Sequence, residues 1–198
     1  MISDKLLQTN NASVQEIKKG EILFNKGEHA HFYYQVKSGE IKMNNYNADG
    51  KEFIQSIFYE GQSFGEPPLF ADIVYPAGAE AIVDSKVYKL PKADFHQLLK
   101  ENPNVHFKIT EVLSLRLYYK AIIASTMSSE EPERRIIKLF DYLKRYVHQI
   151  DEDEKFEVDL KRQQIADLTG LRVETVIRAC KSLEEKSAIQ IKNRKIIR

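Results

Sequence analysis

The sequence has little of what several classes of protein require. Its 198 residues include one cysteine and no tryptophan. The single cysteine, Cys180, excludes an intramolecular disulfide and an iron–sulfur centre held by several cysteines. No apolar run approaches the roughly 18 residues that span a bilayer, and no apolar segment follows Met1 that could act as a secretory signal. We therefore expect a cytoplasmic protein, with no membrane segment and no cofactor.

The chain also lacks a large net charge, because 30 basic side chains face 29 acidic ones. A polyelectrolyte attraction of the whole molecule for nucleic acid is thereby excluded. Whether one part of the chain could bind nucleic acid depends on how the charges are distributed. Residues 161–198 hold ten Lys or Arg and four Asp or Glu, a net charge of +6, whereas residues 1–128 hold fourteen and fifteen, a net charge of −1. Positive charge is concentrated in the last part of the chain.

The first part of the chain consists of short segments rich in Ile, Val, Phe and Tyr. Seven of the eight glycines separate these segments between residues 20 and 78. This spacing is typical of an all-β barrel or jelly roll. We expect strands at residues 21–24, 32–37, 40–45, 52–58, 79–81 and 85–90, with a hairpin turn at residues 48–50.

Helices are predicted after the β region. Residues 92–100 form a short one, and a longer one follows Asn102-Pro103 to about residue 126. The longer helix has more apolar surface than one contact face requires, supplied by Ile109, Val112, Leu113, Leu115, Leu117, Tyr119, Ile122 and Ile123. One apolar face of this helix can cover the β region, which leaves a second apolar face for another subunit. We therefore expect a homodimer joined by a dimerisation helix at about residues 103–127.

A domain boundary is predicted near residue 128. The segment Ser128-Ser129-Glu130-Glu131-Pro132-Glu133 carries capping, acidic first-turn and proline signals for a new helix. Apolar periodicity then continues through residues 134–149. Residues 151–154 are acidic, and we interpret them as a solvated loop because oxygen ligands at calcium-loop spacing are missing.

Residues 162–185 have the pattern of two short helices joined by a tight turn. Gly170 lies where the turn needs a residue that tolerates positive φ. On the second helix one face is apolar (Val176, Ala179, Cys180, Leu183) and the opposite face is charged (Glu174, Arg178, Lys181, Glu185). We therefore expect a packing role for Cys180, with a redox switch as the alternative. An ordinary helical hairpin with a solvated charged face is the alternative, because this pattern is only moderately specific.

The charged face suits the major groove of DNA. Arg178 can contact guanine O6 and N7 with two hydrogen bonds, and Glu174 can accept a hydrogen bond from cytosine N4. Residues 189–191 and 195–197 flank Lys192-Asn193-Arg194, which predicts a basic hairpin that touches phosphate without reading sequence. Together these segments indicate a winged helix-turn-helix with double-stranded DNA as its partner.

The whole arrangement resembles the Crp/Fnr family of bacterial transcription regulators. Gly65-Glu66 before Leu69-Phe70, the long helix and Glu174-Thr175-Val176-Ile177-Arg178 carry the resemblance. It implies an α+β fold, with a cyclic-nucleotide-binding-like jelly-roll domain and dimerisation helix at residues 1–128 and a winged helix-turn-helix at residues 129–198. It also implies a regulator that binds a palindromic operator as a homodimer, without enzymatic activity, and RNA polymerase as a further candidate partner.

The resemblance assigns the DNA-contacting set, in which Glu174 and Arg178 read bases. The full set is Arg172, Val173, Glu174, Thr175, Ile177, Arg178, Lys181, Lys192 and Arg194. Val173 stands where the cAMP receptor protein type has Arg and is similar to the fumarate-nitrate type. Ile177 replaces the Ser found there, so the half-site differs from that of either type.

The resemblance also defines a candidate effector pocket, formed by Gly65, Glu66, Pro76, Ala77, Tyr119 and Lys120. Nucleotide-binding relatives hold the cyclic phosphate with backbone N–H groups and an Arg followed by Ser or Thr. Here Pro67 and Pro68 follow the Gly-Glu pair, and the Arg and Ser positions align with Pro76 and Ala77. We therefore expect no control by cAMP, and the effector is unknown. Tyr119 either lines the remaining pocket or fills it.

Two functions of other classes compete with this interpretation. His29-Ala30-His31 in a β domain is similar to the metal pair of a cupin enzyme. However, the acidic third ligand would fall near Gln35 or Val36, and no later segment supplies a fourth. The other alternative is a dimeric protein-interaction module whose last domain is only a scaffold.

Overall fold

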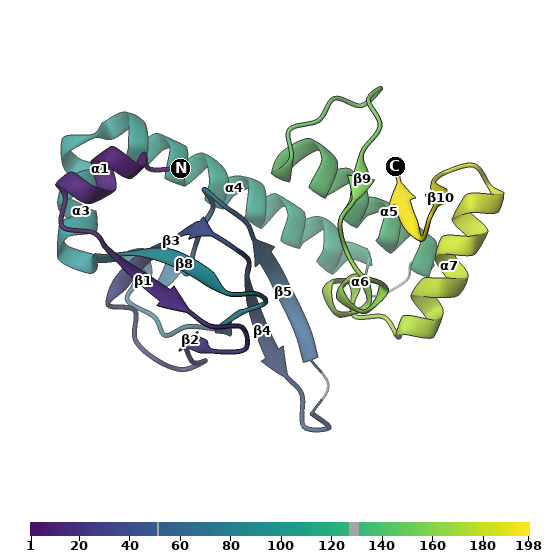
Figure 1. The fold of residues 1–198 in the computed structure, drawn as a ribbon, viewed down its shortest axis with the longest axis horizontal. Helices are drawn as coiled ribbons and strands as arrows, with labels where there is room; N and C mark the ends of the chain where they lie inside the picture. Colours follow the sequence, from purple (N-terminus) through teal and green to yellow (C-terminus); the bar gives the residue numbers. More distant parts are fainter. Residues whose placement is uncertain (51, 127–130) are drawn as a thin grey trace. The chain divides into compact units, whose positions relative to one another are not determined.

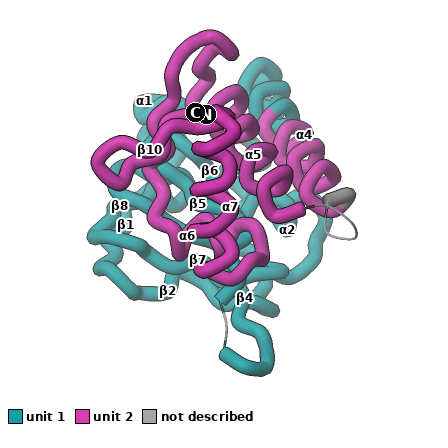
Figure 2. Tube along the Cα trace, turned by 90° about the vertical axis from the view of Figure 1, so that its right-hand side faces the viewer, with its two compact units in different colours: residues 1–111 teal, residues 112–198 magenta. Residues whose placement is uncertain are grey.

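The structure is a computed structural model that describes residues 1–50, 52–126 and 131–198. The chain forms two compact units, residues 1–111 (unit 1) and residues 112–198 (unit 2) (Figure 2). Helix α4 (Pro103–Thr126) begins in unit 1 and ends in unit 2. The predicted boundary at residues 128–129 lies outside the described residues.

Unit 1 contains two antiparallel four-stranded sheets (Figure 1). The first has the order β1 (Ser13–Ile17), β8 (Ser85–Pro91), β3 (Phe32–Ser38) and β6 (Ser63–Phe64). The second has the order β2 (Ile22–Phe24), β7 (Gly78–Ala81), β4 (Ile41–Tyr46) and β5 (Glu52–Phe58). The helices of this unit are α1 (Asp4–Thr9), α2 (Pro67–Ala71), α3 (Lys92–Glu101) and the first part of α4.

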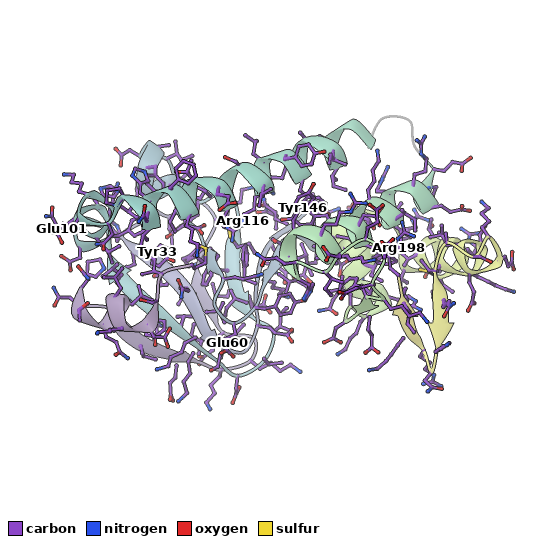
Figure 3. All side chains as sticks on the ribbon, turned by 90° about the horizontal axis from the view of Figure 1, so that it is seen from above. Tyr33, Glu60, Glu101, Arg116, Tyr146 and Arg198 are labelled. Atoms are coloured by element: carbon purple, nitrogen blue, oxygen red, sulfur yellow. The ribbon has the colours of Figure 1, made fainter. Side chains whose placement is uncertain are left out.

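The interior of unit 1 combines aromatic rings with the buried amide of Gln35. Tyr33, labelled in Figure 3, stacks on Phe95 of α3 with ring centroids 4.6 Å apart. Its hydroxyl donates to Gln35 Oε1 at 2.8 Å. Gln35 Oε1 also accepts the Ile2 N–H at 3.1 Å, and Gln35 Nε2 donates to the Ile2 carbonyl at 2.9 Å. The amide thus joins the N-terminal segment to β3 and leaves none of its own polar atoms unpaired, as burial requires.

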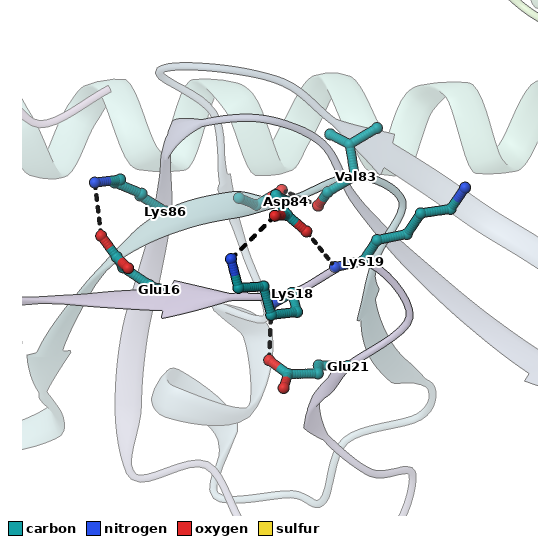
Figure 4. A network of polar contacts seen from close by, with 8 residues as sticks. Glu16, Lys18, Lys19, Glu21, Val83, Asp84 and Lys86 are labelled. Carbon is teal, nitrogen blue, oxygen red and sulfur yellow. Dashed lines mark hydrogen bonds and ion pairs between the residues drawn. The ribbon is translucent and has the colours of Figure 1, made fainter.

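Two turns at the rim of the sheets are joined by polar contacts (Figure 4). Asp84, between β7 and β8, accepts the Lys19 N–H at 2.9 Å and pairs with the Lys18 ammonium at 3.1 Å. The backbone hydrogen bond from Lys19 and the contact with Lys18 together hold the pKa of Asp84 below its ordinary value. Because Asp84 and Lys18 are exposed, we attribute most of the effect on the turn to the backbone bond.

The described residues of unit 2 form four helical segments and a three-stranded sheet besides the end of α4. Its helices are α5 (Pro132–Tyr142), the π-helical turn η1 (Leu143–Val147), α6 (Arg162–Thr169) and α7 (Val173–Glu185). Its antiparallel sheet has the order β10 (Gln190–Lys192), β11 (Lys195–Ile197) and β9 (Glu157–Val158). No helix in the described parts of the chain is both long and apolar enough to cross a membrane.

The structure confirms the six strands, the hairpin turn at residues 48–50 and the helices expected in unit 1, with ends shifted by one or two residues. It also has elements that the sequence pattern did not predict, namely α1, β1, β6, α2 and β9. The expected helix over residues 134–149 is partly wrong. Its α-helical part ends at Tyr142, a π-helical turn follows to Val147, and Gln149 has φ 54°. Of the expected capping segment, residues 128–130 lie outside the described residues, and α5 begins at Pro132.

Candidate DNA-binding surface

The turn between α6 and α7 depends on one glycine. Gly170 has φ 68° and ψ 18°, the left-handed conformation that costs a residue with a Cβ about 1 kcal/mol or more. Its N–H and that of Leu171 both bond to the Ala166 carbonyl, the latter at 3.0 Å. The α6 helix therefore ends at Thr169, and the chain re-enters a helix at Val173, as the sequence predicts.

The packing face of α7 is the predicted one. Val176, Ala179, Cys180 and Leu183 are all buried, with exposed fractions of 0 to 6%. Ile165 and Ala166 of α6 are buried as well. Burial raises the pKa of the Cys180 thiol, so the nucleophilic thiolate is disfavoured and the packing role is retained.

The opposite face of α7 is exposed. It presents Glu174, Ile177, Arg178, Lys181 and Glu185 to solvent, and Glu174 lies in the first helical turn. Residues three and four apart are neighbours on a helix surface, so Glu174, Ile177 and Arg178 form one continuous patch. Arg172 at the N-cap is exposed too, whereas Val173 and Thr175 are half-buried.

The predicted wing is a hairpin of β10 and β11. Lys192 pairs with Lys195 at its closing end, and the two turn residues, Asn193 and Arg194, have φ 49° and 66°. Two positive φ values are the signature of a type I′ turn, whose twist matches that of the strands. Lys192 and Arg194 are exposed, while Lys195 is paired with Glu157 of β9. The basic tip is therefore formed by Lys192 and Arg194.

Three side-chain contacts between separate elements hold these elements together. Arg135 of α5 donates from Nη1 to the Thr169 carbonyl at 3.1 Å, at the end of α6. Glu184 of α7 accepts the Ile191 N–H at 2.9 Å, which anchors the wing to α7. Glu133 of α5 pairs with Lys186, just after α7, at 2.5 Å. Nothing in the periodicity marks these residues, because each acts through a partner 7 to 53 residues away.

The predicted effector residues of unit 1, Gly65, Glu66, Pro76 and Ala77, lie at one corner of the β domain. Gly65 has φ 72°, and a Cβ there would lie 3.1 Å from the Tyr75 ring and 3.2 Å from the Phe24 ring. Those two rings stack with their centroids 3.7 Å apart. Glu66 is 1% exposed, and its carboxylate accepts a hydrogen bond from the Ser63 hydroxyl.

A cyclic phosphate finds few donors at this corner. Pro67 and Pro68 occupy the first positions of α2, where proline supplies no N–H. Pro76 is exposed and Ala77 is fully buried. Neither can supply the guanidinium or hydroxyl that an anion would need there.

The remaining predicted effector residues, Tyr119 and Lys120, belong to unit 2. Tyr119 of α4 stacks on Tyr142 of α5 with ring centroids 3.8 Å apart. The ring centroids of Tyr142 and Tyr146 are 5.9 Å apart. Tyr146 belongs to the π-helical turn and is labelled in Figure 3. Burial raises the pKa of the Tyr119 hydroxyl, whereas Lys120 is exposed. Tyr119 thus packs against the DNA-binding part of its own chain.

The cupin-like histidines do not form a metal site among the described residues. His29 and His31 are exposed, and the His29 backbone pairs with Val74. No group of three His, Cys, Asp or Glu side chains in residues 1–50, 52–126 and 131–198 is placed to hold a metal ion.

The two units therefore define a class of protein: a β domain of the cyclic-nucleotide-binding type together with a winged helix-turn-helix. Comparison with known families agrees. Residues 14–102 match the cyclic nucleotide-binding domain, and residues 134–198 match the Crp-like helix-turn-helix domain. The chain belongs to the Crp/Fnr family and is a DNA-binding transcription regulator.

Individual relatives are distant. The cAMP-activated global transcriptional regulator CRP of Pasteurella multocida is 25% identical over 176 residues, covering 88% of this chain and 84% of that protein. The structure of FixK2 from Bradyrhizobium japonicum has a TM-score of 0.75 at 21% identity, covering 94% and 91% of the two chains. Lysophospholipase NTE1 of Phaeosphaeria nodorum is 25% identical over 119 residues, and the match spans 60% of this chain but only 8% of the enzyme.

Proposed function

We propose that the chain binds a palindromic DNA operator as a homodimer, with Glu174 and Arg178 reading base edges in the major groove. The observation that supports this most directly is the division of α7 into a buried face and an exposed face that presents both side chains. The helix axis is fixed by packing, so the two side chains can approach a groove without rearrangement of the domain. An Arg of this kind pairs with guanine, and a Glu accepts from cytosine N4.

The other predicted contacts divide by chemistry. Arg172, Lys181, Lys192 and Arg194 are exposed cations that we assign to phosphates, which fix register and orientation. Val173 and Thr175 are half-buried at the start of α7, where they are close to any backbone that the helix enters. Ile177 completes the exposed patch.

The dimer is proposed to form through α4. Phe107, Leu117 and Tyr118 of this helix are 76%, 69% and 53% exposed, which is a large apolar area for one helix. A second copy of the same helix is the simplest cover, and two-fold symmetry would then present two α7 helices to a palindrome. We retain residues 1–128, with the dimerisation helix at 103–127, and residues 129–198 as the two domains.

We propose further that cAMP is not the signal, because Pro67 and Pro68 donate no N–H and Pro76 and Ala77 supply no guanidinium or hydroxyl for the cyclic phosphate. A different effector would involve Tyr119 and Lys120 on α4. As a regulator the protein would act by binding, with no catalytic step, in the cytoplasm where the chromosome lies. RNA polymerase is a candidate partner of the DNA-bound form.

Selection of bound duplexes from a random pool tests the proposal. We expect a palindrome whose half-sites are about one helical turn apart, 10–10.5 base pairs, for a dimer of this kind. A palindrome recovered without cell extract indicates that the purified protein binds its operator without a ligand. A palindrome recovered only with extract indicates that a ligand is required. A pool that yields no preferred sequence under either condition contradicts the proposal and favours a scaffold role for the last domain.

Two variants then separate reading from positioning. Arg178→Ala is expected to weaken binding to the selected operator by about 1–3 kcal/mol while leaving binding to random duplex little changed. Lys192→Ala is expected to weaken binding to both duplexes alike and to reduce the salt dependence by about one phosphate contact. Titrations of both duplexes at several salt concentrations measure this. Equal losses on both duplexes from both variants contradict the assigned roles.

A further inference from the structure

One apolar side chain lies on the otherwise polar reading face. Ile177 is 53% exposed, although it occupies the middle of α7 and the packing face of that helix is filled by other residues. The remaining exposed residues of α7 are all charged, namely Glu174, Arg178, Lys181, Glu184 and Glu185. Ile177 follows Glu174 by three residues and precedes Lys181 by four, so it is a direct neighbour of both on the helix surface.

The exposure of Ile177 has no explanation within unit 2. The side chain is too accessible to contribute much to folding through burial. Helix propensity does not explain isoleucine at this position either. The serine that the fumarate-nitrate type has there would have nearly the same helix propensity. Single exposed apolar residues are common on proteins. This one differs because it lies beside the proposed base-reading side chain Glu174 on the same exposed face, where a duplex would cover it.

The chemistry of the major groove offers one apolar partner. Among the groups that base pairs present there, only the C5-methyl of thymine is apolar, and the others are hydrogen-bond donors or acceptors. A branched aliphatic side chain over a donor or acceptor would remove its water without replacing the hydrogen bond, which is unfavourable. Over a methyl group it buries apolar surface on both sides.

We propose that Ile177 reads the 5-methyl group of a thymine in each half-site, adjacent to the base pair that Glu174 contacts. This inference rests on the proposed function and adds one base identity to it. Burial of one methyl group corresponds to about a fourfold change in affinity per half-site. The effect is smaller than that of a two-bonded Arg–guanine contact, so Ile177 adjusts the preference of the site that Arg178 anchors.

The test removes the methyl group from DNA and its partner from the protein separately. In the operator recovered by selection, each thymine is replaced in turn by 2′-deoxyuridine, which differs only in lacking the methyl. We expect one position per half-site at which this change weakens wild-type binding about fourfold. The Ile177→Ala protein should bind the thymine and deoxyuridine operators equally at that position, because the coupling between the two groups is lost. Fluorescence anisotropy on the full chain measures both.

A matched control is Arg178→Ala, which should lower operator affinity but retain the deoxyuridine penalty at the same position. Ile177→Ala should leave binding to random duplex unchanged, which distinguishes loss of reading from loss of folding. Changing the sensitive thymine to cytosine should weaken binding, and 5-methylcytosine at that position should recover part of the loss.

The inference is overturned if no thymine shows a larger deoxyuridine penalty with wild type than with Ile177→Ala. If that happens while Arg178→Ala still loses specificity, the proposed function stands without this contact. If no preferred sequence is recovered at all, the proposed function fails and the inference fails with it.

Discussion

At the scale of single residues, two glycines with nearly the same φ differ in what surrounds them. Gly39 and Gly20 have φ 90° and 82°. A Cβ added at Gly39 would lie 2.8 Å from the Ser85 Cα, whereas one added at Gly20 meets nothing within 4 Å. The Ser85 hydroxyl also accepts the Glu40 N–H at 3.0 Å, so the clash falls where β8 meets the β3–β4 turn.

We predict that Gly20→Ala lowers the free energy of unfolding by about 1 kcal/mol, because it adds only the strain of a positive φ. Gly39→Ala should cost about 3 kcal/mol or more, since the backbone near Ser85 must also move. Urea unfolding of the two variants measures the difference. Equal losses would show that the close approach of Gly39 to Ser85 is not a constraint.

At the scale of elements, a lysine holds three strands of one sheet together. Lys42 of β4 contacts Glu52 of β5 at 2.7 Å and Glu80 of β7 at 3.2 Å. Asn44 Nδ2 donates to both carboxylates. Burial by itself lowers the pKa of Lys42, but the two carboxylates outweigh it and raise the pKa above its ordinary value. The ammonium therefore stabilises the fold below its unfolded pKa while the two carboxylates are ionised, and the stabilisation is lost as pH rises through the folded pKa.

Lys42→Met leaves two carboxylates facing each other without a cation. These side chains are 13 to 23% exposed, so we expect a loss of about 2 kcal/mol at pH 7, less than for a fully buried pair. Acidification relieves the repulsion between the two carboxylates, so stability of the variant should recover as pH falls toward 5. Unfolding of both proteins at pH 7 and pH 5 measures this.

The control is Lys86→Met, which breaks the pair between Lys86 and Glu16 drawn in Figure 4. Both of those side chains are at least half exposed, so the change should be small at either pH. A Lys42→Met protein that loses no more stability than Lys86→Met, or gains none on acidification, would show that the three-strand contact is unimportant.

Elements with a strong repeat were predictable from the sequence, and the two-residue strands were not. The faces of α7 follow from a 3.6-residue period, and Gly170 follows from its place between two apolar stripes. By contrast β6 and β9 have two residues each, too few for any periodicity. The π-helical turn at Leu143–Val147 lies where the pattern predicted that the α-helix would continue. In this turn Lys144 donates to the Glu152 carbonyl at 2.5 Å. Such tertiary contacts leave no local signal.

The site was predictable to the same degree. Glu174, Arg178 and the wing tip lie on exposed surfaces of their elements as the pattern indicates. The positioning contacts of Arg135 and Glu184 were not predictable, because they join residues distant in sequence or on different elements. The stacking of Tyr119 on Tyr142 was equally hidden, since either ring could have been expected to face solvent or the core.

At the scale of the whole molecule, the proposed dimer makes the exposed part of α4 necessary for DNA binding. Leu117 is 69% exposed, so Leu117→Glu should not disturb the folding of either unit. It should place a charge in the helix pair and yield a monomer at micromolar concentration, because an unpaired carboxylate is costly to bury. A monomer engages one half-site at a time and loses the gain from linked binding, which we expect to weaken operator affinity on the order of a hundredfold.

Sedimentation and operator titration on the same samples measure these two effects together. Ile73→Glu is the matched control, because Ile73 is 52% exposed and lies in unit 1 outside α4. It should leave both the mass and the affinity unchanged. If Leu117→Glu remains a dimer, α4 is not the contact between copies. If it becomes a monomer that still binds the full palindrome with wild-type affinity, linkage of two half-sites is not how the regulator achieves its affinity, and one α7 helix with its wing must be sufficient.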